Sequence, residues 1–336
     1  MKKLPLAVAV IAAALTLSGC AKKYTPWENT LEEAKTIASK EGKNLFVVFS
    51  GRGWDGMSDS FFNNVASTEK FQNEVGQKYI LVDYDLSMDT RNAVSIDPKT
   101  ATSAEKKAYS QALKVYEKQV ADTSKYGVKS YPEFYLLSSE GYVLSAFVFN
   151  DNIADPELFF EEFKRYDETA DVMKNLITDI KVSSGKEKAE AIDTFYNATE
   201  TRFRNVISNL AEDYISLDKK NELGKTGFYE NELLFKKAME TLYNGDYSKA
   251  LKMFTDGTGC KNLTDEEKDQ NLVNAVTLML QDESLSLEEQ VKMLEDVVEK
   301  NPDSRYAEDF VKTINRSKEY LKAMAAMNSA EAEGEN

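Results

Sequence analysis

The sequence predicts a mixed α/β domain followed by an all-helical region, and two observations carry this prediction. Apolar runs of strand length recur between residues 45 and 149, separated by segments with helical spacing, whereas no strand pattern follows residue 155. Helical periodicity then continues to the C-terminus. With 336 residues, of which 42% are apolar and 29% charged, the chain is long enough for one large or two ordinary domains.

Composition excludes several classes of function. The formal net charge is −15, and so acidic a surface repels DNA and RNA. The chain contains no His, which excludes Ser-His-Asp and Cys-His catalysis and His-ligated zinc or haem. Because one of the two cysteines, Cys20, belongs to the export segment, no intramolecular disulfide framework is expected. Cys260 is then either a buried thiol or part of an intermolecular disulfide.

The first 20 residues have the pattern of an export signal. Lys2 and Lys3 precede an uncharged apolar stretch of about 14 residues, which is too short for a membrane-spanning helix but suits a signal-peptide core. Residues 17–20, Leu-Ser-Gly-Cys, resemble a bacterial lipobox. The alternative is an ordinary secretory signal that happens to end in Cys.

The lipobox resemblance implies that Cys20 becomes the acylated first residue of the mature protein. Cleavage there removes two lysines and no acid, which changes the net charge from −15 to −17. Two or more acyl chains, palmitate among them, hold a protein at a lipid bilayer without a transmembrane helix. We expect a signal peptide over residues 1–19 and a lipidated tether over 20–29. The expected location is the bacterial cell envelope, at the periplasmic face or the outer membrane.

Helix caps and apolar runs define the elements that follow. Capping boxes at Thr30–Glu33 and Thr102–Glu105 open two helices, and Gly42 ends the first of them. A helix is also expected from Asp55 to beyond residue 75. The expected strands cover residues 45–49, 79–85, 133–137 and 142–149, and the last two form a hairpin.

The change of composition after the hairpin sets the expected domain boundaries. Asp155 and Pro156 have the pattern of a helix cap followed by Pro at the first helical position. We expect the α/β domain over residues 30–152, the helical domain over 153–328 and a disordered tail over 329–336.

The order of elements in the first region resembles the thioredoxin fold. Residues 43–54, a strand followed by Gly-Arg-Gly-Trp, look like the central strand and the Trp that leads into the active-site helix. Residues 126–132, Tyr-Gly-Val-Lys-Ser-Tyr-Pro, look like the segment that ends in a cis-proline. The resemblance covers about residues 27–150. It implies that Trp54, Tyr131 and a cis Pro132 border a peptide-binding groove.

The sequence departs from this family where thioredoxins carry Cys-x-x-Cys. The four positions after Trp54 are Asp55, Gly56, Met57 and Ser58. A thiolate is the nucleophile in disulfide exchange, and neither Asp nor an isolated Ser can replace it. We therefore assign no catalytic residue and expect Asp55 to cap the helix by accepting the Ser58 N–H. The alternative is that this degenerate site binds a ligand.

Neither a metal nor another cofactor is expected. Asp83, Asp85, Ser87 and Asp89 alternate as oxygen ligands of Ca²⁺ do, but the loop lacks the Gly and Glu that an EF-hand needs at its sixth and twelfth positions. A solvated acidic loop is therefore favoured over calcium. Neither a phosphate-binding loop nor a dinucleotide Gly signature is present, so no nucleotide is expected.

Part of the helical region resembles a tetratricopeptide repeat. The first copy consists of small and aromatic residues at repeat spacing: Ala238, Gly245, Tyr247, Ala250 and Phe254. A weaker copy follows at Gln290, Leu294, Val297 and Pro302, about 40 residues along the chain. The alternative is an ordinary helical bundle with one repeat-like hairpin.

Two classes of function remain. The first is a membrane-anchored, redox-inactive scaffold or chaperone-like module that binds the bilayer through Cys20 and a protein partner through its helical domain. The second is a thiol-disulfide oxidoreductase of the envelope that works with partner thiols or with Cys260. The missing Cys pair favours the binding module.

Overall fold

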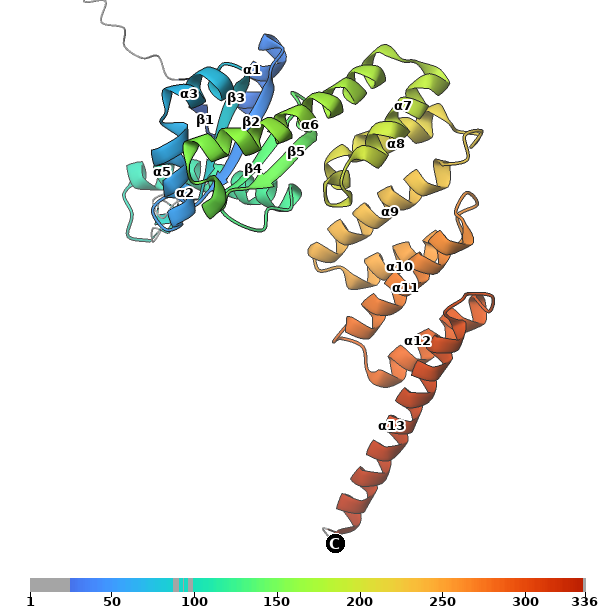
Figure 1. The fold of residues 1–336 in the computed structure, drawn as a ribbon. Coiled ribbons are helices and arrows are strands. Elements are labelled where there is room, and N and C mark those ends of the chain that lie inside the picture. Colours follow the sequence, from blue (N-terminus) through green and yellow to red (C-terminus); the bar gives the residue numbers. More distant parts are fainter. Residues whose placement is uncertain (1–24, 87–90, 93, 96–98, 335–336) are drawn as a thin grey trace, which may run out of the picture.

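The computed structural model describes residues 25–86, 91–92, 94–95 and 99–334, with side chains up to residue 327. The expected signal peptide, Cys20 and residues 335–336 lie outside this range, as do Ser87 and Asp89 of the acidic loop. Figure 1 shows a mixed α/β domain followed by a large all-helical region. The predicted fold class is therefore confirmed.

A five-stranded sheet forms the centre of the first domain, in the order β1-β3-β2-β4-β5. Its strands are β1 (Trp27–Glu28), β2 (Asn44–Ser50), β3 (Tyr79–Asp85), β4 (Glu133–Leu137) and β5 (Val143–Val148). β1, β3 and β2 are parallel, whereas β4 and β5 form the expected antiparallel hairpin beside β2. The two-residue strand β1 was not expected, since its apolar content lies below what a strand pattern requires.

Local capping signals set the two helices that cover one face of the sheet. In α1 (Leu31–Glu41), Thr30 accepts the Glu33 N–H, and Gly42 ends the helix with φ 65°. In α5 (Ser103–Lys125), both hydrogen bonds of the Thr102–Glu105 capping box are present. Both caps agree with the prediction.

The helix expected from Asp55 to beyond residue 75 is broken in two. The first part, residues 56–66, consists of α2 (Gly56–Ser60) and the π-helix η1 (Phe61–Ala66). The second part, residues 69–76, consists of α3 (Glu69–Phe71) and the π-helix η2 (Gln72–Gly76). The Ser67 hydroxyl donates to Asn63 O and the Thr68 hydroxyl to Val65 O, while Thr68 Oγ1 also caps α3. Such local side-chain bonds offer the backbone an alternative to a continuous helix.

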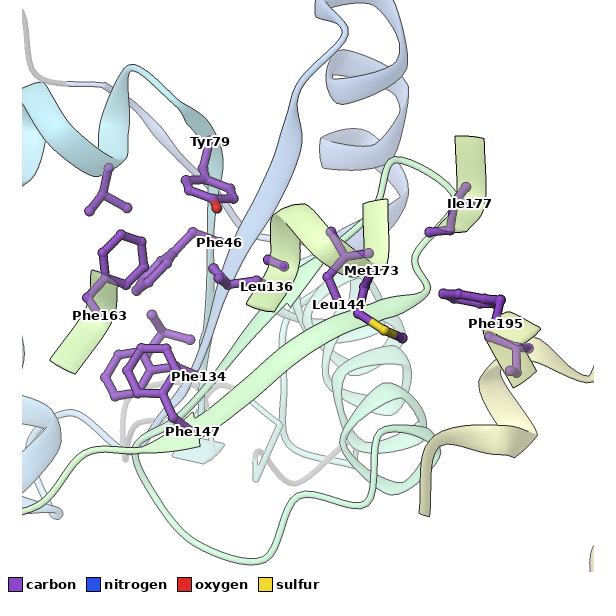
Figure 2. Close-up of a cluster of buried hydrophobic side chains, with 14 of the residues drawn as sticks. Phe46, Tyr79, Phe134, Leu136, Leu144, Phe147, Phe163, Met173, Ile177 and Phe195 are labelled. Carbon is purple, nitrogen blue, oxygen red and sulfur yellow. The ribbon is translucent and has the colours of Figure 1, made fainter. Parts of the chain in front are cut away.

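Helix α6 (Pro156–Val182) joins the two regions through one hydrophobic core. Asp155 caps it and Pro156 occupies its first turn, as predicted. Its first half packs Phe163 against Phe46 of β2, at a ring distance of 5.9 Å. Its second half carries Met173 and Ile177 in the same cluster, which continues to α7 (Figure 2). The boundary expected at residue 152 thus falls before a helix that shares its core with the sheet.

The helical arm is defined as residues 185–334. Its elements are α7 (Gly185–Ala198), the 3₁₀ helix η4 (Thr201–Ile207), α8 (Ser208–Leu217), α9 (Thr226–Tyr243), α10 (Tyr247–Gly257), α11 (Asp265–Gln281), α12 (Leu287–Lys300) and α13 (Ala307–Gly334). Consecutive helices pack on one another along the arm (Figure 1).

The α9–α10 hairpin has the packing that its small residues indicate. Ala238 and Ala250 are fully buried between the helices, beside the buried ring of Phe254. Gly245 lies in the turn with φ 83°, a conformation that favours glycine. Across residues 25–86 and 99–334, none of the helices combines the length and the apolar content that crossing a membrane requires.

Candidate functional site

Trp54 lies in a tight loop at the C-terminal end of β2. The Trp54 and Asp55 N–H groups both donate to Gly51 O, at 3.2 and 2.8 Å. The indole covers Gly51 so closely that a Cβ there would lie 2.4 Å from Trp54 Cζ2, so this position requires glycine. Trp54 Nε1 donates to Leu86 O at 2.9 Å. The ring is thereby fixed while 47% of the residue stays exposed.

Asp55 and Ser58, the residues that the sequence resemblance aligns with the two cysteines of a thioredoxin, are hydrogen-bonded to each other. Asp55 Oδ2 accepts the Ser58 N–H at 2.8 Å and the Ser58 hydroxyl at 2.5 Å. Ser58 Oγ also accepts the Gly51 N–H at 3.0 Å. Ser58 is fully buried. Its hydroxyl thus donates one hydrogen bond, accepts another and is not accessible to a substrate.

The two residues between them differ in environment. Gly56 is exposed and faces open space, whereas Met57 is half-buried and packs against the core cluster of the sheet. Met57 therefore acts mainly in packing.

The segment before β4 lies beside Trp54. The peptide bond between Tyr131 and Pro132 is cis, as expected from the resemblance. The Trp54 and Tyr131 rings meet edge to face at 5.5 Å. Burial is the largest cause that raises the pKa of Tyr131, followed by the nearby Tyr116. Within the described residues, the backbone N–H and C=O of Tyr131 form no hydrogen bond, so an extended peptide could pair with them.

A buried carboxylate lies next to this site, at the end of β3. Asp83 is 5% exposed; its Oδ1 accepts the Ser50 hydroxyl at 2.8 Å and its Oδ2 lies 3.0 Å from Arg52 Nη2. Arg52 also pairs with Asp85 at 2.9 Å. Burial raises the pKa of Asp83 to about 6, although Arg52 and the Ser50 hydrogen bond oppose the shift.

The sequence analysis placed Asp83 and Asp85 at the end of a strand, before a solvated acidic loop, and did not predict their pairing with Arg52. The alternation of acids was visible, but the partner lies two residues past the neighbouring strand, and only the parallel register of β2 and β3 brings it near. Among the described residues, no group of three or more acidic or Cys side chains could hold a metal ion.

Cys260 lies in the connection between α10 and α11, far from the degenerate site. It is half-buried and has no disulfide. Burial raises the pKa of its thiol, and Glu230 and Asp256 raise it further, so little thiolate forms at neutral pH. Figure 1 places α10 and α11 in the helical arm, well apart from α2.

A comparison with protein families agrees with the fold of the first domain. Residues 31–148 match the family model of the thioredoxin-like domain. One solved structure that resembles this chain is described as a DsbH oxidoreductase. It has 16% sequence identity and a TM-score of 0.34, over 44% of this chain and 88% of that one. No curated protein matches the chain.

Proposed function

We propose that the protein is a redox-inactive, thioredoxin-like binding module, anchored by an acylated Cys20 in the bacterial cell envelope. The observation that carries this proposal is the Asp55–Ser58 pair. Both positions that would hold thiols instead form a closed helix cap, which includes the Gly51 N–H. Disulfide exchange needs a thiolate nucleophile, and this site has none.

The surface beside the cap, where the resemblance implies a peptide groove, supports a binding role. Trp54 presents a fixed, half-exposed aromatic surface, and the free backbone groups of Tyr131 lie next to it. Rigid aromatic side chains provide binding area at a low cost in conformational entropy. The groove therefore suits an extended segment of a partner protein, held by backbone pairing and by contact with the indole.

The helical arm is the second surface that we propose for partner binding. Residues 1–152 contain 18 basic and 18 acidic residues, whereas residues 153–336 contain 24 basic and 39 acidic residues. The whole acidic excess thus belongs to residues 153–336, which comprise α6 and the helical arm. Stacked helical pairs offer extended surfaces for protein binding. A basic or mixed-charge polypeptide suits this charge, with an association rate that falls as salt rises.

Insulin reduction tests the loss of redox chemistry. Wild-type protein should not exceed the Cys260→Ser variant, because neither carries thiols at the degenerate site. The matched gain-of-function variant is Asp55→Cys with Ser58→Cys. Its two thiols should be oxidised to each other, since α2 begins at the position where thioredoxins place the pair. Reduction of insulin by the wild type above the Cys260→Ser level would favour an oxidoreductase that uses Cys260.

A further inference from the structure

A hollow of about 640 Å³ opens between α1 and α5, on the face of the sheet opposite α6. Four lysines and two acids among its lining residues set its charge: Lys35, Lys40, Lys118, Lys125, Glu32 and Asp122. These side chains give a formal charge of +2, whereas residues 1–152 as a whole carry 18 basic and 18 acidic residues. The hollow is therefore more positive than the domain that contains it.

The acids of the hollow already have partners. Glu32 forms an ion pair with Lys118. Asp122 Oδ2 accepts the Tyr84 hydroxyl at 2.7 Å. In the part of the chain that the structure describes, Lys35, Lys40 and Lys125 form no ion pair within 4.0 Å. Three ammonium groups therefore line the hollow without a carboxylate at contact distance.

Lys35 is the residue that points most clearly to an anion. Its side chain is half-buried, and its Nζ would lie 3.1 Å from a Cβ at Gly141, so the ammonium is held close to that turn. The same turn is fixed by the Tyr126 hydroxyl, which donates to Gly141 O at 2.9 Å. Burial lowers the pKa of Lys35 and repulsion from Lys125 lowers it further, although Asp122, Glu140 and Glu32 oppose the shift. A bound anion would favour the charged form of Lys35 and so oppose the effects of burial and of Lys125.

We propose that this hollow binds a phosphate group carried as a dianion, as in a phosphate monoester. Ammonium groups bind phosphate as compact point charges with several donors, and the charge of a dianion matches the +2 of the lining side chains. The phosphate could belong to a soluble molecule or to a lipid headgroup. The proposal is independent of the redox and partner-binding roles.

Titration calorimetry of the chain that begins after residue 20 tests the proposal, with inorganic phosphate as the probe at constant ionic strength. Saturable binding at one site is expected. Lys35→Gln and Lys125→Gln should each weaken it at least tenfold. The matched control is Lys106→Gln, an exposed lysine of α5 outside the hollow. Lys125 is itself exposed, so its variant keeps the test valid if Lys35→Gln lowers stability.

Two further probes distinguish the sources of the phosphate. Binding of glycerol 3-phosphate supports a soluble ligand, whereas Lys35-dependent binding to phosphatidic acid vesicles supports a headgroup. The proposal is overturned if none of the three probes binds, or if Lys106→Gln weakens binding as much as the two variants in the hollow.

Discussion

Arg202 of the helical arm binds Glu133, the residue that directly follows Pro132. Its Nη1 lies 3.3 Å from Glu133 Oε1, and the carboxylate is only 2% exposed. The other oxygen accepts the Lys129 N–H at 3.0 Å. Asn205 Nδ2 donates to Lys125 O at 2.9 Å. Residues of the helical arm thus contact both ends of the segment that carries the cis-proline.

Replacing Arg202 should therefore destabilise the protein. Breaking a buried ion pair costs about 3–5 kcal/mol, and since Arg202 is about one-third exposed we expect about 2 kcal/mol for Arg202→Met. Urea unfolding measures the change. Arg202→Lys should retain part of the stability, and Glu200→Gln, which removes the more exposed partner of Arg202, should change it little. Equal losses in Glu200→Gln and Arg202→Met would contradict this account of Glu133.

The cap at the degenerate site makes a second prediction about stability. Asp55→Ala removes an N-cap and should cost about 1 kcal/mol. Ser58→Ala leaves the buried Gly51 N–H without its acceptor and should cost about 1–3 kcal/mol. Thermal or urea unfolding measures both. Ser60→Ala, at the end of the same short helix, is the control and should lie within about 0.5 kcal/mol of the wild type.

The buried Asp83 predicts a pH dependence. Its pKa rises from 3.8 to about 6 on folding, so the folded state favours the protonated form. The stability that this residue contributes is complete below pH 4 and is lost as the pH rises to about 6. Two pKa units correspond to about 3 kcal/mol.

Asp83→Asn isolates this effect. The free energy of unfolding of the variant, relative to the wild type, should increase by up to about 3 kcal/mol between pH 4 and pH 7. Urea titrations at both pH values measure the difference. Arg52→Gln removes the positive charge that favours ionised Asp83. The free energy of unfolding of this variant should therefore fall more steeply with rising pH than that of the wild type. A difference that stays constant over this range would show that Asp83 does not titrate there.

Membrane anchoring should depend on one residue. Cys20→Ala removes the acylation site, and we expect the protein to move from the detergent phase into the aqueous phase. Retention of the variant in membranes after salt and carbonate washes would contradict the lipoprotein proposal. Replacing Ala21 by Ser, next to the modified residue, serves as the control and should leave partitioning unchanged.

The contribution of each surface to partner binding requires the full chain. A fragment that ends at residue 152 lacks α6 and would expose Phe46 and Phe134, so its interactions would not be informative. We expect Tyr243→Ala, at an 84% exposed position of α9, to reduce crosslinking to partners in membranes several-fold. Trp54→Ala should reduce it less. The reverse order would assign the main binding role to the groove.

Signals that act over a few residues were sufficient to predict much of this structure. Thr30, Thr102 and Asp155 cap their helices through bonds that span three residues, and apolar runs identified four of the five strands. The cis bond before Pro132 followed from family resemblance. The caps and the strands depend on local sequence, which is why they could be predicted without the resemblance.

Features that depend on distant partners were not predicted. The Arg202–Glu133 pair spans 69 residues, and neither residue belongs to a motif. The sequence analysis also did not predict that α6 packs on the sheet and continues the same core to α7. Its apolar residues have the spacing of any amphipathic helix. Which half meets the sheet is decided by packing against β5. The hollow between α1 and α5 could not be predicted either, because its lining residues come from two helices that are distant in the sequence.

The parallel pairing of β1 with β3 determines where the chain enters the first domain. Thr25 is bonded to Gln72 and to Gly76, near the start of β3, whereas Trp54 follows the opposite end of the sheet, a strand length of about 23 Å away. Only four residues lie between Cys20 and Thr25, so the five Cα–Cα steps reach at most about 18 Å. An acyl anchor at Cys20 would therefore keep Thr25 and the start of β3 close to the bilayer. Trp54, at the opposite end of the sheet, would then face the aqueous compartment, where it would meet soluble polypeptides rather than lipid.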